Sequence, residues 1–316
     1  MRSCAAIAFL CLLGACERVA QAPAAPAPAA SDIPAQPEGM TPSIPEILAA
    51  STPEEWRPIN PENTLYMDLP QNDGTVGRVI IELAPDFAPN HVANVKALAR
   101  EGYFANGAIT RVQDNYVVQW AQAADPERPP KVGQKTLKAE FTRPRDTTVG
   151  FDVLPDPDTY APEVGFSNGF PAARDDTSMW LTHCYGTVGV GRDNDPDSGG
   201  GTELYAIIGQ SPRGLDRNIT VLGRVVQGME LLSSLPRGTG DLGFYTSPDQ
   251  YHRFTNIRVA ADVPVAERTP LETLRTDSES FDKLVNSRRW RNDAFYHVPQ
   301  GRIGLCNITV PVRAAQ

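Results

Sequence analysis

The sequence predicts a mainly β protein whose central domain is a closed antiparallel barrel with two helices. Short runs of β-branched and aromatic residues recur between residues 64 and 259, and turn residues separate them. Only two segments of this region show apolar residues at helical spacing. Many short strands with few helices favour a closed barrel, because closure leaves no strand edge exposed.

Seven strands are expected in this central region, which we place at residues 61–265. They cover residues 65–69, 77–83, 108–121, 186–192, 203–209, 220–226 and 253–259. The first two form a hairpin around the turn residues 71–74. One helix is expected to begin at Pro89 and to stop at Gly102, and a shorter one covers residues 228–235.

Two segments do not follow the barrel pattern. Residues 142–180 are rich in Pro, Asp and Gly without a clear period, so we expect a long insertion there. Residues 266–316 form a C-terminal extension. Within it, Phe281, Leu284, Val285 and Arg288 indicate a short helix, and residues 302–312 are expected to form a last strand.

The N-terminus has the pattern of an export signal. Arg2 precedes an apolar run at residues 5–13 that is too short to span a bilayer core of about 30 Å. The run ends in Leu13-Gly14-Ala15-Cys16, which resembles a bacterial lipobox. That resemblance implies a signal peptide at residues 1–15, a lipid on Cys16 and a periplasmic protein anchored to a membrane by this lipid. The alternative is an ordinary secretory signal.

A tether is expected after the signal. Residues 21–45 are rich in Ala and Pro and have almost no large apolar side chains, so they cannot bury a core. We assign residues 16–60 to this tether. The net charge of −9 argues against a nucleic-acid partner, because binding to phosphates requires positive charge.

Two of the five cysteines remain free to pair with each other. Cys4 and Cys11 leave with the signal peptide, and Cys16 is the expected lipid site. An even remainder in an oxidising compartment predicts a disulfide between Cys184 and Cys306, with two buried free thiols as the alternative.

Eight motifs occur in the order in which they occur in cyclophilins. They are Gly77–Leu83, Ala88–Val95, Thr110–Val112 with Tyr116–Gln119, Lys138–Phe141, Gly186–Arg192 with Asp195–Ser198, Gly201–Tyr205, Leu215–Asp216 and Thr220–Met229. Over roughly residues 63–263 the chain therefore resembles the cyclophilin-type peptidyl-prolyl cis/trans isomerases. The resemblance implies a closed eight-stranded barrel, an enzyme that needs neither cofactor nor metal, and a monomer that binds proline-containing polypeptides.

The resemblance also implies roles for single residues. Arg111 matches the catalytic arginine, which contacts the carbonyl of the substrate proline, and Gln119 matches the glutamine that binds the substrate backbone. The pocket for the proline ring is expected at Tyr116, Val117, Tyr205 and Leu215. Arg111 and Gln119 would face one side of a regular strand, whereas Tyr116 and Val117 require a bend near residues 114–115.

Several positions depart from the family pattern. Gly214 stands where the family has a tryptophan, Ile219 replaces a His or Tyr, and Glu203 replaces a neutral glutamine. Trp120 and Ala121 replace two glycines. These departures leave open a second reading, in which the domain is a catalytically weak or inactive module that binds peptides of the cell envelope.

A metal site is the other alternative. Asp193, Asp195 and Asp197 alternate as in a calcium loop, but the pattern fails at Ser198 and Leu204, where such a loop needs Gly and Glu. The four histidines show no ligand spacing. We therefore expect no metal.

Overall fold

The computed structural model describes residues 33–71, 73–123, 125 and 128–316. The expected signal peptide, Cys16 and the rest of the expected tether up to residue 32 lie outside the described residues. None of the helices found in the described part of the chain is long and apolar enough to cross a membrane.

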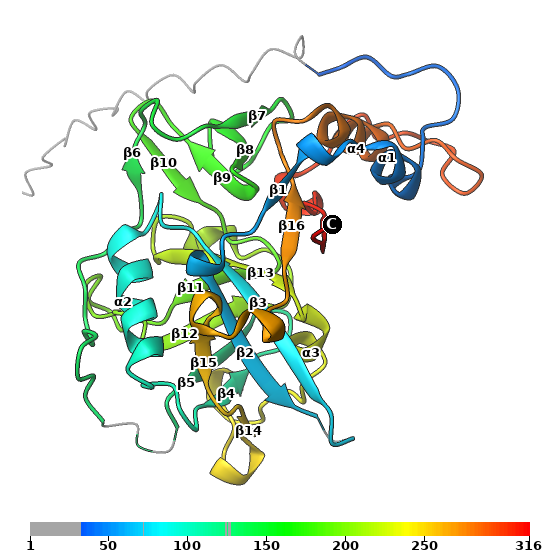
Figure 1. The fold of residues 1–316 in the computed structure, drawn as a ribbon. Helices are drawn as coiled ribbons and strands as arrows, with labels where there is room; N and C mark the ends of the chain where they lie inside the picture. The colour runs from blue at the N-terminus through cyan, green and yellow to red at the C-terminus, as the bar shows by residue number, and fades with distance from the viewer. Residues whose placement is uncertain (1–32, 72, 124, 126–127) are drawn as a thin grey trace, which may run out of the picture. The chain divides into compact units, whose positions relative to one another are not determined.

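The largest sheet has nine antiparallel strands in the order β14-β4-β5-β12-β11-β13-β3-β2-β15 (Figure 1). Its strands are β2 (Thr64–Pro70), β3 (Val76–Leu83), β4 (Ala108–Val112), β5 (Val117–Ala121), β11 (Thr187–Val190), β12 (Glu203–Ile207), β13 (Val221–Gln227), β14 (His252–Arg253) and β15 (Ile257–Val259). Their inward side chains form one apolar core, in which Leu65, Ile81 and Trp120 are fully buried.

This sheet is open and curled, so the prediction of a closed eight-stranded barrel is wrong. The reason lies in the last segment, which was expected to form one strand over residues 253–259. Its first part pairs with β4 and its second part pairs with β2, at opposite ends of the sheet. Between them Phe254 turns into the core, where its ring fills the space beside Gly107, and the ladder of hydrogen bonds is interrupted.

Helices α2 (Pro89–Arg100) and α3 (Met229–Ser233) confirm the two expected helices of this domain. Pro89 opens α2, where its missing N–H costs no hydrogen bond, and Gly102 follows the helix with a φ of +70°. Val92, Val95 and Leu98 of α2 are buried against the core of the sheet.

The segment expected as one strand over residues 108–121 is a hairpin. β4 ends at Val112, the chain turns over residues 113–116, and β5 begins at Val117. Asn115 has a φ of +51°, a conformation that Asn tolerates better than most residues. The bend expected near residues 114–115 is therefore a complete reversal of the chain.

The insertion is a second sheet rather than irregular chain. Five antiparallel strands are hydrogen-bonded in the order β6-β10-β9-β8-β7. They are β6 (Arg143–Pro144), β7 (Asp152–Leu154), β8 (Glu163–Ser167), β9 (Phe170–Arg174) and β10 (Ser178–Leu181). Asn168 and Gly169 both have positive φ between β8 and β9, as the tightest hairpin turns require, so this Asn-Gly pair was a signal for the sheet.

A third sheet joins a strand near the start of the described chain to two strands near its C-terminal end. β1 (Trp56–Pro58) pairs with β16 (Leu271–Leu274), which pairs with β17 (Val312–Ala314). The expected tether therefore ends before residue 60, since α1 (Ile44–Ala50) and β1 are folded. In the extension, α4 (Glu279–Arg289) confirms the expected helix, but the last strand covers residues 312–314 instead of 302–312.

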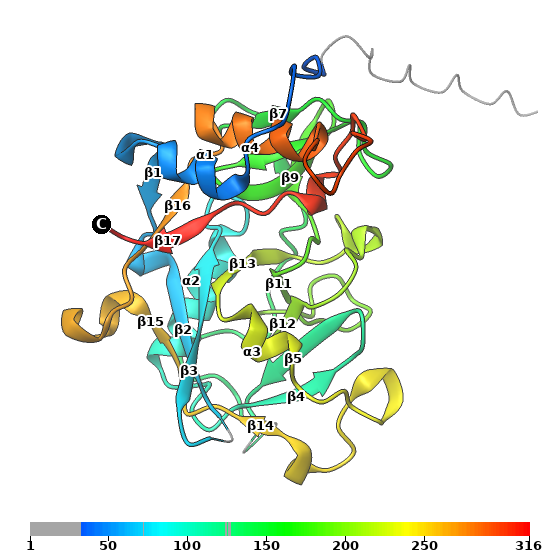
Figure 2. The ribbon, with the colours of Figure 1, turned by 90° about the vertical axis from the view of Figure 1, so that its right-hand side faces the viewer.

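The insertion and the extension share a second apolar core. Its members come from α1, β1, the insertion sheet, α4 and the C-terminal segment, and they include Trp56, Phe166, Trp180, Phe281 and Leu305. Figure 2 shows β17 running beside β16, next to α1 and α4. A disulfide joins Cys184 to Cys306 at the border of this core, the pairing expected from the cysteine count.

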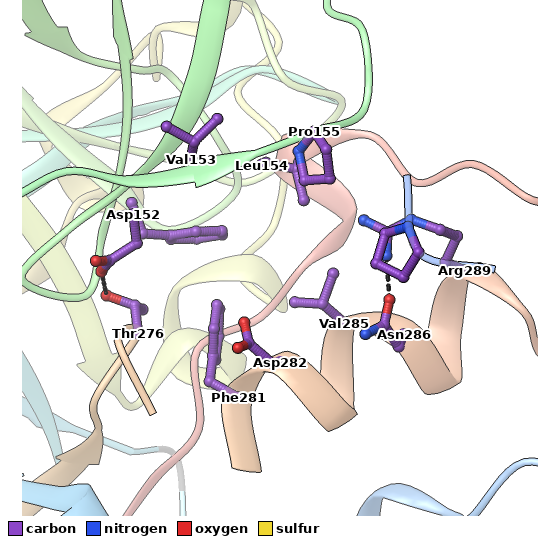
Figure 3. Close-up of a pocket in the computed structure, with 12 residues that line it drawn as sticks. Asp152, Val153, Leu154, Pro155, Thr276, Phe281, Asp282, Val285, Asn286 and Arg289 are labelled. Atoms are coloured by element: carbon purple, nitrogen blue, oxygen red, sulfur yellow. Dashed lines mark hydrogen bonds between the residues drawn. The ribbon is translucent and has the colours of Figure 1, made fainter. Parts of the chain in front are cut away.

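A small cavity of about 190 Å³ remains between β7 and α4 (Figure 3). Asp152 accepts a hydrogen bond from the Thr276 hydroxyl at 2.6 Å there, and burial raises the pKa of both Asp152 and Asp282. Arg289, which also lines the cavity, is bound to Asp156. None of the residues expected to act on a substrate lies in this cavity.

Candidate active site

The β4–β5 hairpin brings the two expected catalytic residues together. Arg111 and Gln119 are directly opposite each other in the ladder, and an Nη of Arg111 donates to the Gln119 side-chain oxygen at 3.1 Å. The turn is held from outside, because the Asn115 side chain accepts from the backbone N–H of Gln210 at 2.7 Å. The eight-residue spacing thus places both side chains on one face, across two strands rather than along one.

Two further acceptors fix the Arg111 guanidinium. Its Nε donates to the carbonyl oxygen of Leu242 at 2.7 Å, and its second Nη donates to Gln113. The guanidinium also lies over the rings of Tyr116 and Phe244, at 5.7 and 5.2 Å from their centroids. These contacts use three of the five N–H groups of an arginine, so two remain for a substrate.

Burial lowers the pKa of Arg111. The guanidinium nevertheless stays charged near neutral pH, because the ordinary value for arginine is far above it. A partly buried cation interacts more strongly with a carbonyl dipole than an exposed one, since less water screens it. The site therefore holds a permanent, oriented positive charge.

The segment 238–244 completes this part of the site, and the sequence reasoning did not find it. Gly238 N–H donates to the carbonyl of Val112, and Tyr245 N–H donates to that of Thr110, so the segment lies against β4. Gly243 has a φ of +79°, and a Cβ there would lie 2.6 Å from the Cα of Gln113. Three glycines around two apolar residues were the only signal in the sequence.

The pocket beside Arg111 has an apolar floor. Val117, Tyr205 and Ile207 form a small buried cluster, against which Tyr116 and Ile219 pack. The cavity has a volume of about 420 Å³. Its lining residues include all six side chains expected in the site, namely Arg111, Tyr116, Val117, Gln119, Tyr205 and Leu215.

Two of the departures from the family pattern, Glu203 and Ile219, also line this cavity. The Gln119 amide nitrogen donates to Glu203 at 2.7 Å, so Gln119 bridges Arg111 and a carboxylate. Gly214, where the family has a tryptophan, is not among the lining residues, and a Cβ there would have no neighbouring atom within 4 Å.

Two of the aspartates considered for calcium accept hydrogen bonds from backbone N–H groups. Asp195 accepts from the N–H of Asp197, and Asp197 accepts from the N–H of Ala139, at 2.9 and 2.8 Å. No group of three or more His, Cys, Asp or Glu side chains in the described residues could hold a metal ion.

Residues 66–259 match the family described as "Cyclophilin type peptidyl-prolyl cis-trans isomerase/CLD". The protein named "Probable peptidyl-prolyl cis-trans isomerase" of Brucella suis biovar 1 (strain 1330) is 28% identical over 197 residues, which cover 62% of this chain and 83% of that protein. The protein of the same name from Brucella abortus (strain 2308) has the same identity and coverage.

A similar solved structure covers a larger part of this chain than these relatives do. The cyclophilin AquaCyp293 from Hirschia baltica is 24% identical, with a TM-score of 0.65, and the match covers 84% of this chain and 99% of that one. It confirms the cyclophilin fold. Because the family match covers more than half of the chain and includes every residue of the candidate site, the chain belongs to the cyclophilin-type peptidyl-prolyl cis/trans isomerases.

Proposed function

We propose that this protein catalyses the cis/trans isomerisation of X–Pro bonds in polypeptides of the bacterial cell envelope and so assists their folding. Beyond the family assignment, one structural observation supports the proposal. The guanidinium of Arg111 is fixed by three acceptors at the edge of a cavity whose floor is apolar.

This arrangement fits the physical demands of the reaction. Cis and trans X–Pro bonds differ by about 0.5–1 kcal/mol, whereas rotation between them has a barrier near 20 kcal/mol, because it breaks the amide resonance. Lowering the barrier requires no nucleophile. It requires a group that binds the twisted amide more strongly than either planar form.

Each group of residues in the site has one role in the isomerisation. The proline ring packs on Val117 and Tyr205, and Gln119 binds the substrate backbone beside it. The free N–H groups of Arg111 bind the proline carbonyl. They also stabilise the amide nitrogen as it becomes pyramidal during rotation. Because Arg111 is already oriented, little reorganisation is needed when the twisted state forms.

An exchange assay on a proline-containing tetrapeptide tests the proposal directly. Purified protein should broaden and exchange the cis and trans signals in the NMR spectrum of the peptide at substoichiometric concentration. Binding of the peptide without any acceleration would contradict the proposal and establish the alternative, a silent peptide-binding module. The absence of a tryptophan side chain at Gly214 and the carboxylate of Glu203 at the cavity are the observations that favour this alternative.

We further propose that the protein is a periplasmic lipoprotein, anchored as a monomer through Cys16. The motif Leu13-Gly14-Ala15-Cys16 and the Ala/Pro-rich residues after it support this. Lipoprotein processing attaches several acyl chains, which makes attachment stable where a single chain binds only weakly.

Cys16→Ser is expected to move the protein out of the membrane fraction, or to leave its signal peptide attached, without unfolding the domain. The first element that the structure describes, α1, begins at Ile44, well beyond the substitution, so the thermal unfolding midpoint should not change. Mass spectrometry of the wild-type N-terminus gives the independent readout. A mature chain that begins after Cys16 and carries no lipid would rule out the anchor.

A further inference from the structure

A fully buried histidine lies directly beneath the proline pocket. His183 has 0% of its surface exposed and lies next to the disulfide residue Cys184. Its Nδ1 lies 3.0 Å from Oδ1 of Asp216, and its Nε2 lies 2.9 Å from the Tyr205 hydroxyl. Since a carboxylate only accepts hydrogen bonds, Nδ1 carries the proton, and in the neutral ring Nε2 accepts from Tyr205.

This bond determines how the Tyr205 ring is held. Burial raises the pKa of Tyr205, so its hydroxyl remains a donor. Gly189 is opposite Tyr205 in the ladder, and a Cβ on Gly189 would lie 2.2 Å from the hydroxyl oxygen. The missing side chain therefore provides the passage through which the hydroxyl reaches His183, while the ring itself lines the pocket.

His183 is itself held by a chain of charged side chains. Nε of Arg213 donates to Asp216 at 2.5 Å, and the two Nη atoms of Arg213 donate to both oxygens of Asp158 at 2.9 and 3.1 Å. Burial alone would lower the pKa of Arg213, but the charges of Asp216 and Asp158 outweigh it and raise the pKa. Asp158 belongs to the insertion, between β7 and β8.

We propose that His183 is a positioning residue of the isomerase: through the Tyr205 hydroxyl it holds the aromatic floor of the proline pocket at a fixed orientation. This inference rests on the proposed function of the same site. The chain from Asp158 through Arg213 and Asp216 fixes the His183 ring, and it makes the insertion part of the support of the pocket. Without the bond, only packing holds the end of the Tyr205 ring in its place against Gly189.

A double-mutant cycle between His183 and Tyr205 tests this. Tyr205→Phe removes only the hydroxyl, and His183→Leu removes its partner. Each is expected to raise KM for the tetrapeptide about fivefold, the size expected for one hydrogen bond, with kcat within about twofold of wild type. KM changes because the floor contacts the proline ring in the planar and twisted states alike.

The double variant and the variant His183→Gln show whether His183 positions Tyr205 or whether its substitution merely disturbs the fold. The double variant should have the KM of either single variant, since both remove the same bond, whereas independent effects would multiply. His183→Gln keeps a side-chain acceptor for the hydroxyl and should restore KM to within about twofold of wild type. Tyr66→Phe is the matched control: its buried hydroxyl bonds the backbone of Thr269, far from the pocket, so KM should not change.

A wild-type KM in Tyr205→Phe, or multiplied effects in the double variant, would overturn the inference. If His183→Leu does not fold, Tyr205→Phe and His183→Gln still decide the question. A wild-type protein that binds the tetrapeptide without exchange would end the proposed function but not the inference, because the peptide Kd then replaces KM in the same cycle.

Discussion

Arg111→Ala is expected to lower kcat/KM for an X–Pro peptide at least about tenfold, which corresponds to about 1.4 kcal/mol of barrier. The substitution removes the guanidinium that three acceptors, Leu242, Gln119 and Gln113, hold at the edge of the proline pocket. Loss of an interaction made mainly in the twisted state lowers kcat as well as kcat/KM. NMR exchange rates at several peptide concentrations measure both.

Two further variants show whether the guanidinium itself matters. Arg111→Lys keeps the charge but cannot reach Leu242, Gln113 and Gln119 with one plane of donors, so it should recover only part of the lost rate. Arg253→Ala, which removes an exposed arginine from β14 on the neighbouring edge, should leave the rate unchanged. An Arg111→Ala protein that exchanges the peptide at the wild-type rate would exclude Arg111 from the mechanism.

The expected site residues could be brought together from the sequence because most of their contacts are local. Arg111 and Gln119 are eight residues apart, and a hairpin joins them. Tyr205 reaches the same place because β12 pairs with β5, and the sequence indicated this only through the resemblance to the family. The Leu242 carbonyl is 131 residues from Arg111 along the chain, and no local pattern connects the two.

The fold too could be predicted where it depends on local sequence patterns, but not where it depends on long-range pairing. Strand and helix periods are local, so α2, α3, α4 and most strands of the large sheet were recognisable. Closure of the sheet depends on where residues 252–259 pair, which is a long-range property. The same holds for β1, whose short Trp56–Pro58 segment becomes a strand only because β16, more than 200 residues later, supplies its partner.

His183 shows a different limit of sequence reasoning. A single histidine has many ordinary structural roles, and its role here depends on contacts with two residues far away in the sequence, Asp216 and Tyr205. The tyrosine at position 205 was recognisable as a pocket aromatic, but the direction of its hydroxyl was not. That direction follows from the space beside Gly189, which only the packed structure reveals.

Removal of the Cys184–Cys306 disulfide is expected to cause the largest loss of stability. The bond closes a loop with a sequence separation of 122 residues, for which the chain-entropy model gives about 4–5 kcal/mol in the free energy of unfolding. It ties the C-terminal segment to the start of β11, and the only strand in that segment is the three-residue β17. The double variant Cys184→Ala, Cys306→Ala should therefore unfold at a clearly lower urea concentration than the wild type.

The wild-type protein with and without a reducing agent provides the control for the two substitutions. The reduced protein should unfold at the urea concentration of the double variant, and reductant should not shift the double variant itself. Hydrogen exchange should quicken first at β17, because the disulfide is the covalent link that keeps this strand beside β16. If the wild type unfolds at the same urea concentration in both redox states, the bond does not stabilise the fold, and the packing of the second core alone holds the extension in place.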